Sequence, residues 1–264
     1  MSGPVVVGVD GSSSGLAAVE AAAREADRRG TGLRLAYALG WPSARVPPPG
    51  VPPWDPHGTG LRELVNGSLT EAERRARRVA PRVTITRDVL VGDPATVLES
   101  ASRTASLTVV GGRTATRAVG LPRDSVAGRL TAHGRCPVLV VRGRPARSGP
   151  VLLADDVSQA AAEFAFAEAS ERGADLVVLH TRAGTGRRPA GSLPRLREKY
   201  SHVTVRERWV RGRAGRALVD AGVGAQLLVI AARHRAADVL PSSVGRAVVA
   251  HAHCPVAVVP SGEA

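Results

Sequence analysis

Two segments of this chain, HGRCPVLVV at positions 133–141 and HAHCPVAVV at positions 251–259, are nearly identical. In each segment a histidine precedes Cys-Pro-Val and a continuous apolar run. A short apolar run bounded by a turn signal is typical of a buried β-strand. The question is whether one strand recurs by chance or whether the whole chain is a duplication.

The residues around these two segments also correspond. Ser125-Val126 matches Ser243-Val244 at the same spacing, and LTVVG at 107–111 matches LLVIA at 227–231 at a slightly longer spacing. Collinear matches of this kind predict the duplication of a unit of roughly 120 to 145 residues, which is the size of one domain.

The boundary between the two copies falls in the polar segment RGRPARSGP at 142–150. We therefore predict a first domain over residues 1–145 and a second over 146–264. The first copy is longer because it contains a proline-rich stretch at 41–60. We interpret this stretch as a partner-binding surface, as an ordered cover over the end of the sheet, or as a disordered segment. Its Pro-Pro-Pro sequence favours the extended polyproline conformation.

The composition predicts an aliphatic core and a basic surface. Hydrophobic residues make up 44% of the 264 residues, but aromatic residues only 3%, and the net charge is +13. A charge of this sign favours association with polyanions. Because the arginines are dispersed and aromatic stacking partners are scarce, we do not expect nucleic-acid recognition, although an arginine-rich nucleic-acid-associated protein remains an alternative. The densest arginine clusters lie at 74–78 and 206–216.

The chain shows no signal-peptide pattern and no apolar stretch approaching the roughly 20 residues that span a bilayer. Its two cysteines cannot form a disulfide framework. We therefore expect a cytoplasmic protein without membrane contact.

Each copy alternates apolar runs with helix-like segments. In the first copy the run VVVGVD at 5–10 precedes the helix-like SSSGLAAVEAAAREADRRG at 12–30, and further pairs follow. Apolar runs alternating with amphipathic helices predict an α/β fold, in which a doubly wound parallel sheet has helices on both faces.

In such sheets, ligands bind beyond the carboxyl ends of the strands. Asp10 and Ser12 follow the first predicted strand, Gly111 ends the fourth, and Ser125-Val126 begins the next helix. Either serine could donate to a phosphate or cap its helix, and Asp10 could accept hydrogen bonds from a nucleoside or act as a cap.

Several motifs together resemble the universal stress protein family in its tandem form. They are VVVGVDGSS at 5–13, VLVGDPATVL at 89–98, TVVGGR at 108–113 and the repeated CPV segments. The resemblance covers nearly the whole chain. It implies two five-stranded parallel sheets of strand order 3-2-1-4-5, paired through their fifth strands as an internal pseudo-dimer. Pairing would also protect two apolar edge strands from aggregation.

Many members of that family bind ATP through a spaced glycine motif. Gly111 occupies its first position and Ser125 its last, but Thr114 replaces the second glycine and Asp124 the third. In the second copy Ala231 replaces the first glycine and His234 the second. The resemblance implies possible ATP binding in the first domain only. The residues that it nominates are Asp10, Ser12, Gly111, Arg113, Thr114, Ser125 and Val126.

Histidine–cysteine pairs, His133 with Cys136 and His251 with Cys254, have the short spacing of metal ligands. We favour buried structural thiols and predict no metal site. No nucleophile elbow or phosphate loop is present, so we favour a non-catalytic role.

The overall prediction is a stress-response or regulatory protein that acts on an unknown protein partner. A slow ATPase is the alternative, and a further homodimer of the whole chain stays open.

Overall fold

A computed structural model describes residues 3–40, 59–112, 125–142, 148–154, 158–181, 192–232 and 243–260. The chain forms two compact units, residues 1–111 and 112–264.

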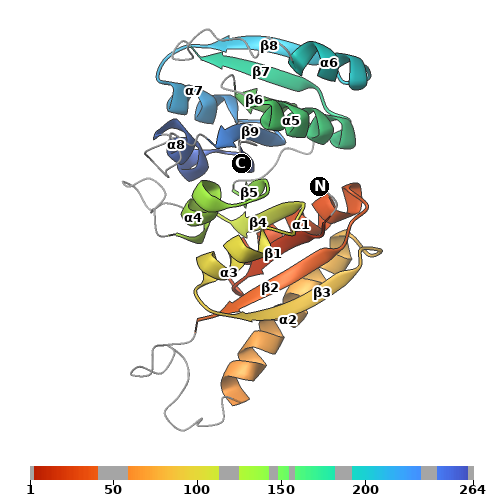
Figure 1. The fold of residues 1–264 in the computed structure, drawn as a ribbon, viewed down its shortest axis with the longest axis vertical. Coiled ribbons are helices and arrows are strands. Elements are labelled where there is room, and N and C mark those ends of the chain that lie inside the picture. The colour runs from red at the N-terminus through yellow and green to blue at the C-terminus, as the bar shows by residue number, and fades with distance from the viewer. Residues whose placement is uncertain are drawn as a thin grey trace. The chain divides into compact units, whose positions relative to one another are not determined.

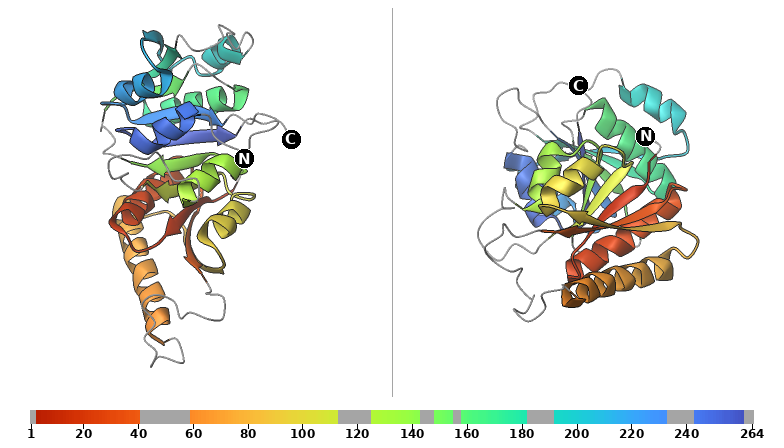
Figure 2. Two further views of the ribbon diagram at one scale, coloured as in Figure 1. Left: turned by 90° about the vertical axis from the view of Figure 1, so that its left-hand side faces the viewer. Right: turned by 60° about the horizontal axis from the view of Figure 1, so that its bottom comes forward.

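The first unit is a doubly wound α/β unit with parallel strands in the order β3-β2-β1-β4. Figure 2 shows α1 and α2 on one face of this sheet and α3 on the other. Its elements are β1 (Val5–Val9), α1 (Ser13–Arg28), β2 (Leu33–Leu39), α2 (Thr59–Val79), β3 (Ile85–Val91), α3 (Pro94–Ala101) and β4 (Leu107–Gly111).

Small side chains bring α1 close to the sheet. Ala18, Ala22 and Ala23 are fully buried on one side of this helix, and the three valines Val5–Val7 of β1 are equally inaccessible. Valine suits a strand that is buried on both faces, because its branched side chain packs well on a pleated surface. The aliphatic core expected from the composition is therefore observed.

The second unit contains the complete second copy and the last helix and strand of the first. Its strand order is β5-β10-β9-β6-β7-β8, and Figure 1 labels all of these strands except β10. Its elements are α4 (Val126–His133), β5 (Val138–Val141), β6 (Val151–Ala154), α5 (Gln159–Arg172), β7 (Leu176–Thr181), α6 (Ser192–Lys199), β8 (Val205–Val210), α7 (Ala214–Ala221), β9 (Leu227–Ala232), α8 (Ser243–His251) and β10 (Val256–Pro260).

The two repeated Cys-Pro-Val segments are neighbours in this sheet. The strand β5 pairs with β10 in antiparallel orientation, with Val138 opposite Val258 and Val140 opposite Val256. The four valines are at most 3% exposed. The predicted fold class is confirmed: the order β8-β7-β6-β9-β10 is the 3-2-1-4-5 arrangement, and the fifth strands of the two copies pair with each other.

The compact units do not divide at the predicted repeat boundary. The division falls after Gly111, at the end of β4, because the pairing with β10 draws β5 into the second unit. The predicted boundary at 145/146 separates the two copies of the repeated sequence, not the compact units, and it stays a prediction.

The expected helices and strands all appear, with ends shifted by a few residues. The helix α2 begins at Thr59, inside the proline-rich stretch, and the rest of that stretch lies outside the described residues. No helix in the described ranges is both long and apolar enough to span a bilayer.

Candidate functional site

The turn after β1 fixes a carboxylate at the end of that strand. Gly11 has φ +73°, a left-handed conformation that glycine adopts without strain, and it reverses the chain between Asp10 and Ser12. The backbone N–H of Ser12 then donates to Asp10 Oδ1 at 3.0 Å, and the Ser12 hydroxyl donates to the same oxygen at 2.7 Å. The Asp10 carboxylate is therefore held in one orientation.

Ser12 is also the N-cap of α1. Its Oγ accepts a hydrogen bond from the backbone N–H of Gly15 at 3.0 Å, which satisfies one of the free donors of the first helical turn. A Cβ at Gly15 would lie 2.2 Å from Asp10 Oδ1, so the carboxylate lies directly over this turn. The helix N-terminus carries a partial positive charge and stabilises the negative charge of Asp10.

Gly111 brings the end of β4 against the same corner. A Cβ on Gly111 would lie 2.7 Å from the carbonyl oxygen of Ser14 and 3.1 Å from the backbone nitrogen of Gly15. The structure thus places Asp10, Ser12 and Gly111 together. It also supplies a reason for glycine that the motif did not reveal, since any side chain at Gly111 would collide with the backbone of α1.

Two of the other predicted site residues, Ser125 and Val126, belong to the second unit. Ser125 is the N-cap of α4 in the second unit, where its Oγ accepts from the Gly128 N–H at 3.0 Å, and Val126 is the first residue of that helix. Arg113 and Thr114 lie outside the described residues. The capping alternative is thus observed for Ser12 and Ser125, and ligand binding by either serine stays a prediction.

Replacing Ser12 by Ala tests the capping role. We expect Ser12→Ala to lower the free energy of unfolding by about 1 kcal/mol, because a helix N–H and the Asp10 carboxylate each lose a partner. Chemical denaturation measures this change. The matched control is Ser13→Ala, because Ser13 is exposed and has no side-chain partner among the described residues. Equal effects of the two substitutions would contradict the capping role.

Sequence reasoning missed a buried arginine. Arg142 directly follows β5 and is only 9% exposed, and its Nη1 donates to the carbonyl oxygen of Val249 in α8 at 2.7 Å. Burial lowers the pKa of its guanidinium. A Cβ on Gly112 would lie 2.3 Å from Arg142 Cγ, so the arginine stem covers that glycine. The sequence placed Arg142 in the linker, and no local signal distinguished it from the other arginines.

The two cysteines are buried thiols in the second unit. Cys136 and Cys254 are not in a disulfide and are at most 1% exposed, and burial raises the pKa of Cys254 to about 11. The antiparallel register of β5 and β10 places them at opposite ends of the strand pair, six residues apart along it, or roughly 20 Å at 3.4 Å per residue. This register excludes a disulfide between them.

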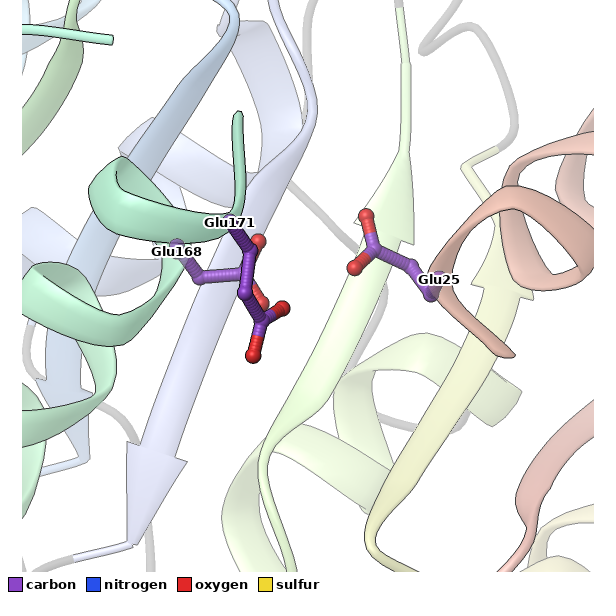
Figure 3. Close-up of side chains that lie close together, drawn as sticks. All are labelled: Glu25, Glu168 and Glu171. Atoms are coloured by element: carbon purple, nitrogen blue, oxygen red, sulfur yellow. The ribbon is translucent and has the colours of Figure 1, made fainter. Parts of the chain in front are cut away.

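Two buried glutamates have ion-pair partners on their own helices. Figure 3 shows Glu25, which comes from α1 of the first unit, and Glu168 and Glu171, which come from α5 of the second. Glu25 is 2.5 Å from Arg28 Nη2, and Glu168 is 2.7 Å from Arg172 Nη2. Each arginine compensates the burial of its carboxylate, so both glutamates have a structural role.

The fold and this corner define a class of protein. Parallel strands with helices on both faces are the architecture of doubly wound domains, which bind ligands beyond the carboxyl ends of the strands. Here this strand arrangement occurs twice in one chain.

Comparison with known proteins narrows this class to one family. The universal stress protein family matches residues 1–142 and 185–260. Universal stress protein Rv2623 of Mycobacterium tuberculosis is 32% identical over 286 aligned residues, which cover 96% of this chain and 95% of the relative. A universal stress protein of Archaeoglobus fulgidus has a similar structure, with a TM-score of 0.77, 18% identity, and coverage of 99% and 97% of the two chains.

A shorter match is a universal stress protein solved in complex with cAMP. It is 28% identical, covers 53% of this chain and 96% of its own, and has a TM-score of 0.41.

From the family match and the identity to Rv2623 together, this chain belongs to the universal stress protein family, in a tandem two-copy form.

Proposed function

We propose that this protein is a non-catalytic stress-response protein of the cytoplasm, in which the first copy keeps a weak nucleoside-binding crevice and the second has lost it. The observation that carries the proposal is the fixed carboxylate of Asp10 at the carboxyl end of β1, next to Gly111 of β4. The two buried cysteines are not in a disulfide, which agrees with a reducing compartment.

One oxygen of Asp10 is available to a ligand. Both hydrogen bonds from Ser12 go to Oδ1, and Oδ2 has no hydrogen-bond partner among the described residues. A carboxylate oxygen accepts hydrogen bonds only, so it suits the hydroxyl groups of a ribose or the amino group of a base. Because Oδ1 is already held, little conformational entropy is lost when Oδ2 binds.

The phosphates of a nucleotide would be bound elsewhere. The N-terminus of α1 already faces the Asp10 carboxylate, so a phosphate there would meet a negative charge at short range. In the family motif the phosphate-binding positions correspond to residues 113–125, where Thr114 and Asp124 replace glycines. These replacements support weak rather than tight binding of a phosphorylated ligand.

In the second copy the position of Gly111 is taken by Ala231 in β9. A Cβ at Gly111 would collide with the first turn of α1, so the second copy, with a methyl group at this position, cannot have the same close contact between strand and helix. This difference supports the loss of the second crevice.

Isothermal titration with magnesium-ATP and with adenosine tests the proposal. We expect weak binding of both, of similar affinity, and at least a tenfold loss in Asp10→Ala. The matched control is Asp93→Ala, because Asp93 follows β3 and not β1, and it caps α3 in the same unit by accepting from the Thr96 N–H at 3.0 Å. No heat with either ligand, or equal losses in the two variants, would overturn the proposal.

A further inference from the structure

An exposed tryptophan lies in an arginine cluster on the second unit. Trp209 of β8 is 71% exposed, and Arg208, Arg211 and Arg213 flank it in sequence and are all exposed. We call these four residues the β8 patch. The strand β8 ends the strand order of its sheet, so its outer edge has no neighbouring strand in the described chain (Figure 1).

One face of the Trp209 ring is stacked on a neighbouring side chain. His180 of β7 lies opposite it in the strand register, and the two rings stack with centroids 4.7 Å apart and planes 30° apart. His180 Nε2 is 3.1 Å from Glu207 Oε2, and Arg197 donates to the other oxygen of Glu207 at 2.9 Å. One ring face is therefore positioned by the protein, whereas most of the remaining ring surface is open to solvent.

The three arginines of the β8 patch have no ionic partner among the described residues. Their neighbours differ: Arg206 is 3.1 Å from Asp175, and Arg216 is 3.8 Å from Asp220. The helix α7 begins after Arg213, which makes no side-chain capping bond. The patch therefore has three uncompensated positive charges and an uncapped helix N-terminus.

The first copy provides an internal comparison. Its β3 and following turn align with this segment because Gly92 matches Gly212, and both glycines have positive φ. At the four matching positions the first copy has Asp88, Val89, Val91 and Asp93. Asp88 is paired with Arg34, and Asp93 caps α3. On the same backbone scaffold, the second copy has therefore exchanged two negative charges for positive ones and gained an aromatic ring.

We propose that the β8 patch binds single-stranded nucleic acid, with a base stacked on Trp209 and phosphates bound by Arg208, Arg211 and Arg213. The inference goes beyond the proposed function and uses a different surface. Phosphates supply the negative charge that the arginines require. A single strand is favoured over a duplex or an acidic protein, because only an unpaired base has a free ring face to stack on the exposed indole.

The geometry of an edge strand suits this ligand. Trp209 and Arg208 project from opposite faces of β8 because successive side chains alternate. A flexible single strand that follows the open edge can place a base on the Trp209 side and a phosphate near Arg208. The expectation from composition, that aromatic residues are too scarce for nucleic-acid binding, did not anticipate one placed inside an arginine cluster.

Fluorescence anisotropy with a labelled dT12 oligonucleotide at low salt tests the proposal. We expect Trp209→Ala to weaken binding by about 5- to 100-fold, the usual cost of losing one stacked base. We expect Arg208→Ser/Arg211→Ser/Arg213→Ser to reduce the slope of log affinity against log salt by about 2, because three phosphate contacts are lost. Circular dichroism verifies that each variant is folded.

The control carries the same change of net charge. Arg62, Arg82 and Arg103 are exposed arginines of the first unit, and replacing all three by Ser should leave most of the affinity intact. The proposal is overturned if the wild-type protein does not bind at low salt, or if both triple variants lose affinity equally. It is also overturned if duplex DNA or polyglutamate competes as well as dT12, since the patch would then bind polyanions without stacking.

Discussion

Val140→Asp should lower the free energy of unfolding by about 3–5 kcal/mol, the usual cost of an unpaired charge buried in an apolar core. Val140 is completely buried in β5, and its cross-strand partner Val256 of β10 is also 0% exposed. The introduced carboxylate would have neither water nor a positive partner there. Because folded domains are stable by only about 5–15 kcal/mol, a large part of the stability of the second unit would be lost.

Urea denaturation followed by circular dichroism measures this loss. Val91→Asp makes the same chemical change in another strand, at a side chain that is 65% exposed, and should alter the stability by no more than about 0.5 kcal/mol. A loss below about 1 kcal/mol for Val140→Asp would show that β5 and β10 are not buried against each other.

Phe166→Ala should cost about 3–5 kcal/mol, the range for removing a large side chain from a packed core. Phe166 of α5 is fully buried and is the largest such side chain in the described chain. Its helix otherwise buries mainly alanines, among them Ala162, Ala165 and Ala169, and these are too short to fill the cavity that the ring would leave. The ring also lies 5.8 Å from that of Tyr200.

The control substitution is on the same helix. Phe164 is only partly buried, so Phe164→Ala should cost clearly less than Phe166→Ala, by about 2 kcal/mol. Both variants can be compared by thermal and urea unfolding. If Phe164→Ala were the more damaging change, the orientation of α5 on its sheet would have to be revised.

Local patterns were enough to predict the elements and the way they repeat. The short-range signals were the two Cys-Pro-Val segments, the serines before α1 and α4, and the proline after Asp93. The structure has a strand at each Cys-Pro-Val segment and a helix start at each serine and at the proline. Such signals work because capping, turn formation and strand burial depend on residues that are close in the chain. They also suggested that Asp10, Ser12 and Gly111 lie at strand ends.

Contacts between distant residues could not be predicted in this way. The exposure of Arg142 and Trp209 cannot be read from neighbours in sequence, since one is buried under α8 and the other is stacked on His180 of β7. The same holds for the two cysteines, whose separation depends on the register of β5 against β10.

The sequence by itself determined a duplicated, doubly wound α/β chain and the residues that begin its helices. It could do so because the spacing of apolar residues and the chemistry of turns and helix starts depend on residues a few positions apart. Only the tertiary structure decided why Gly111 must lack a side chain, where Arg142 is buried and which side chains surround Trp209. The physical reason is that burial and partner choice arise when separate strands and helices pack together, and a single segment carries no information about the surface it will meet.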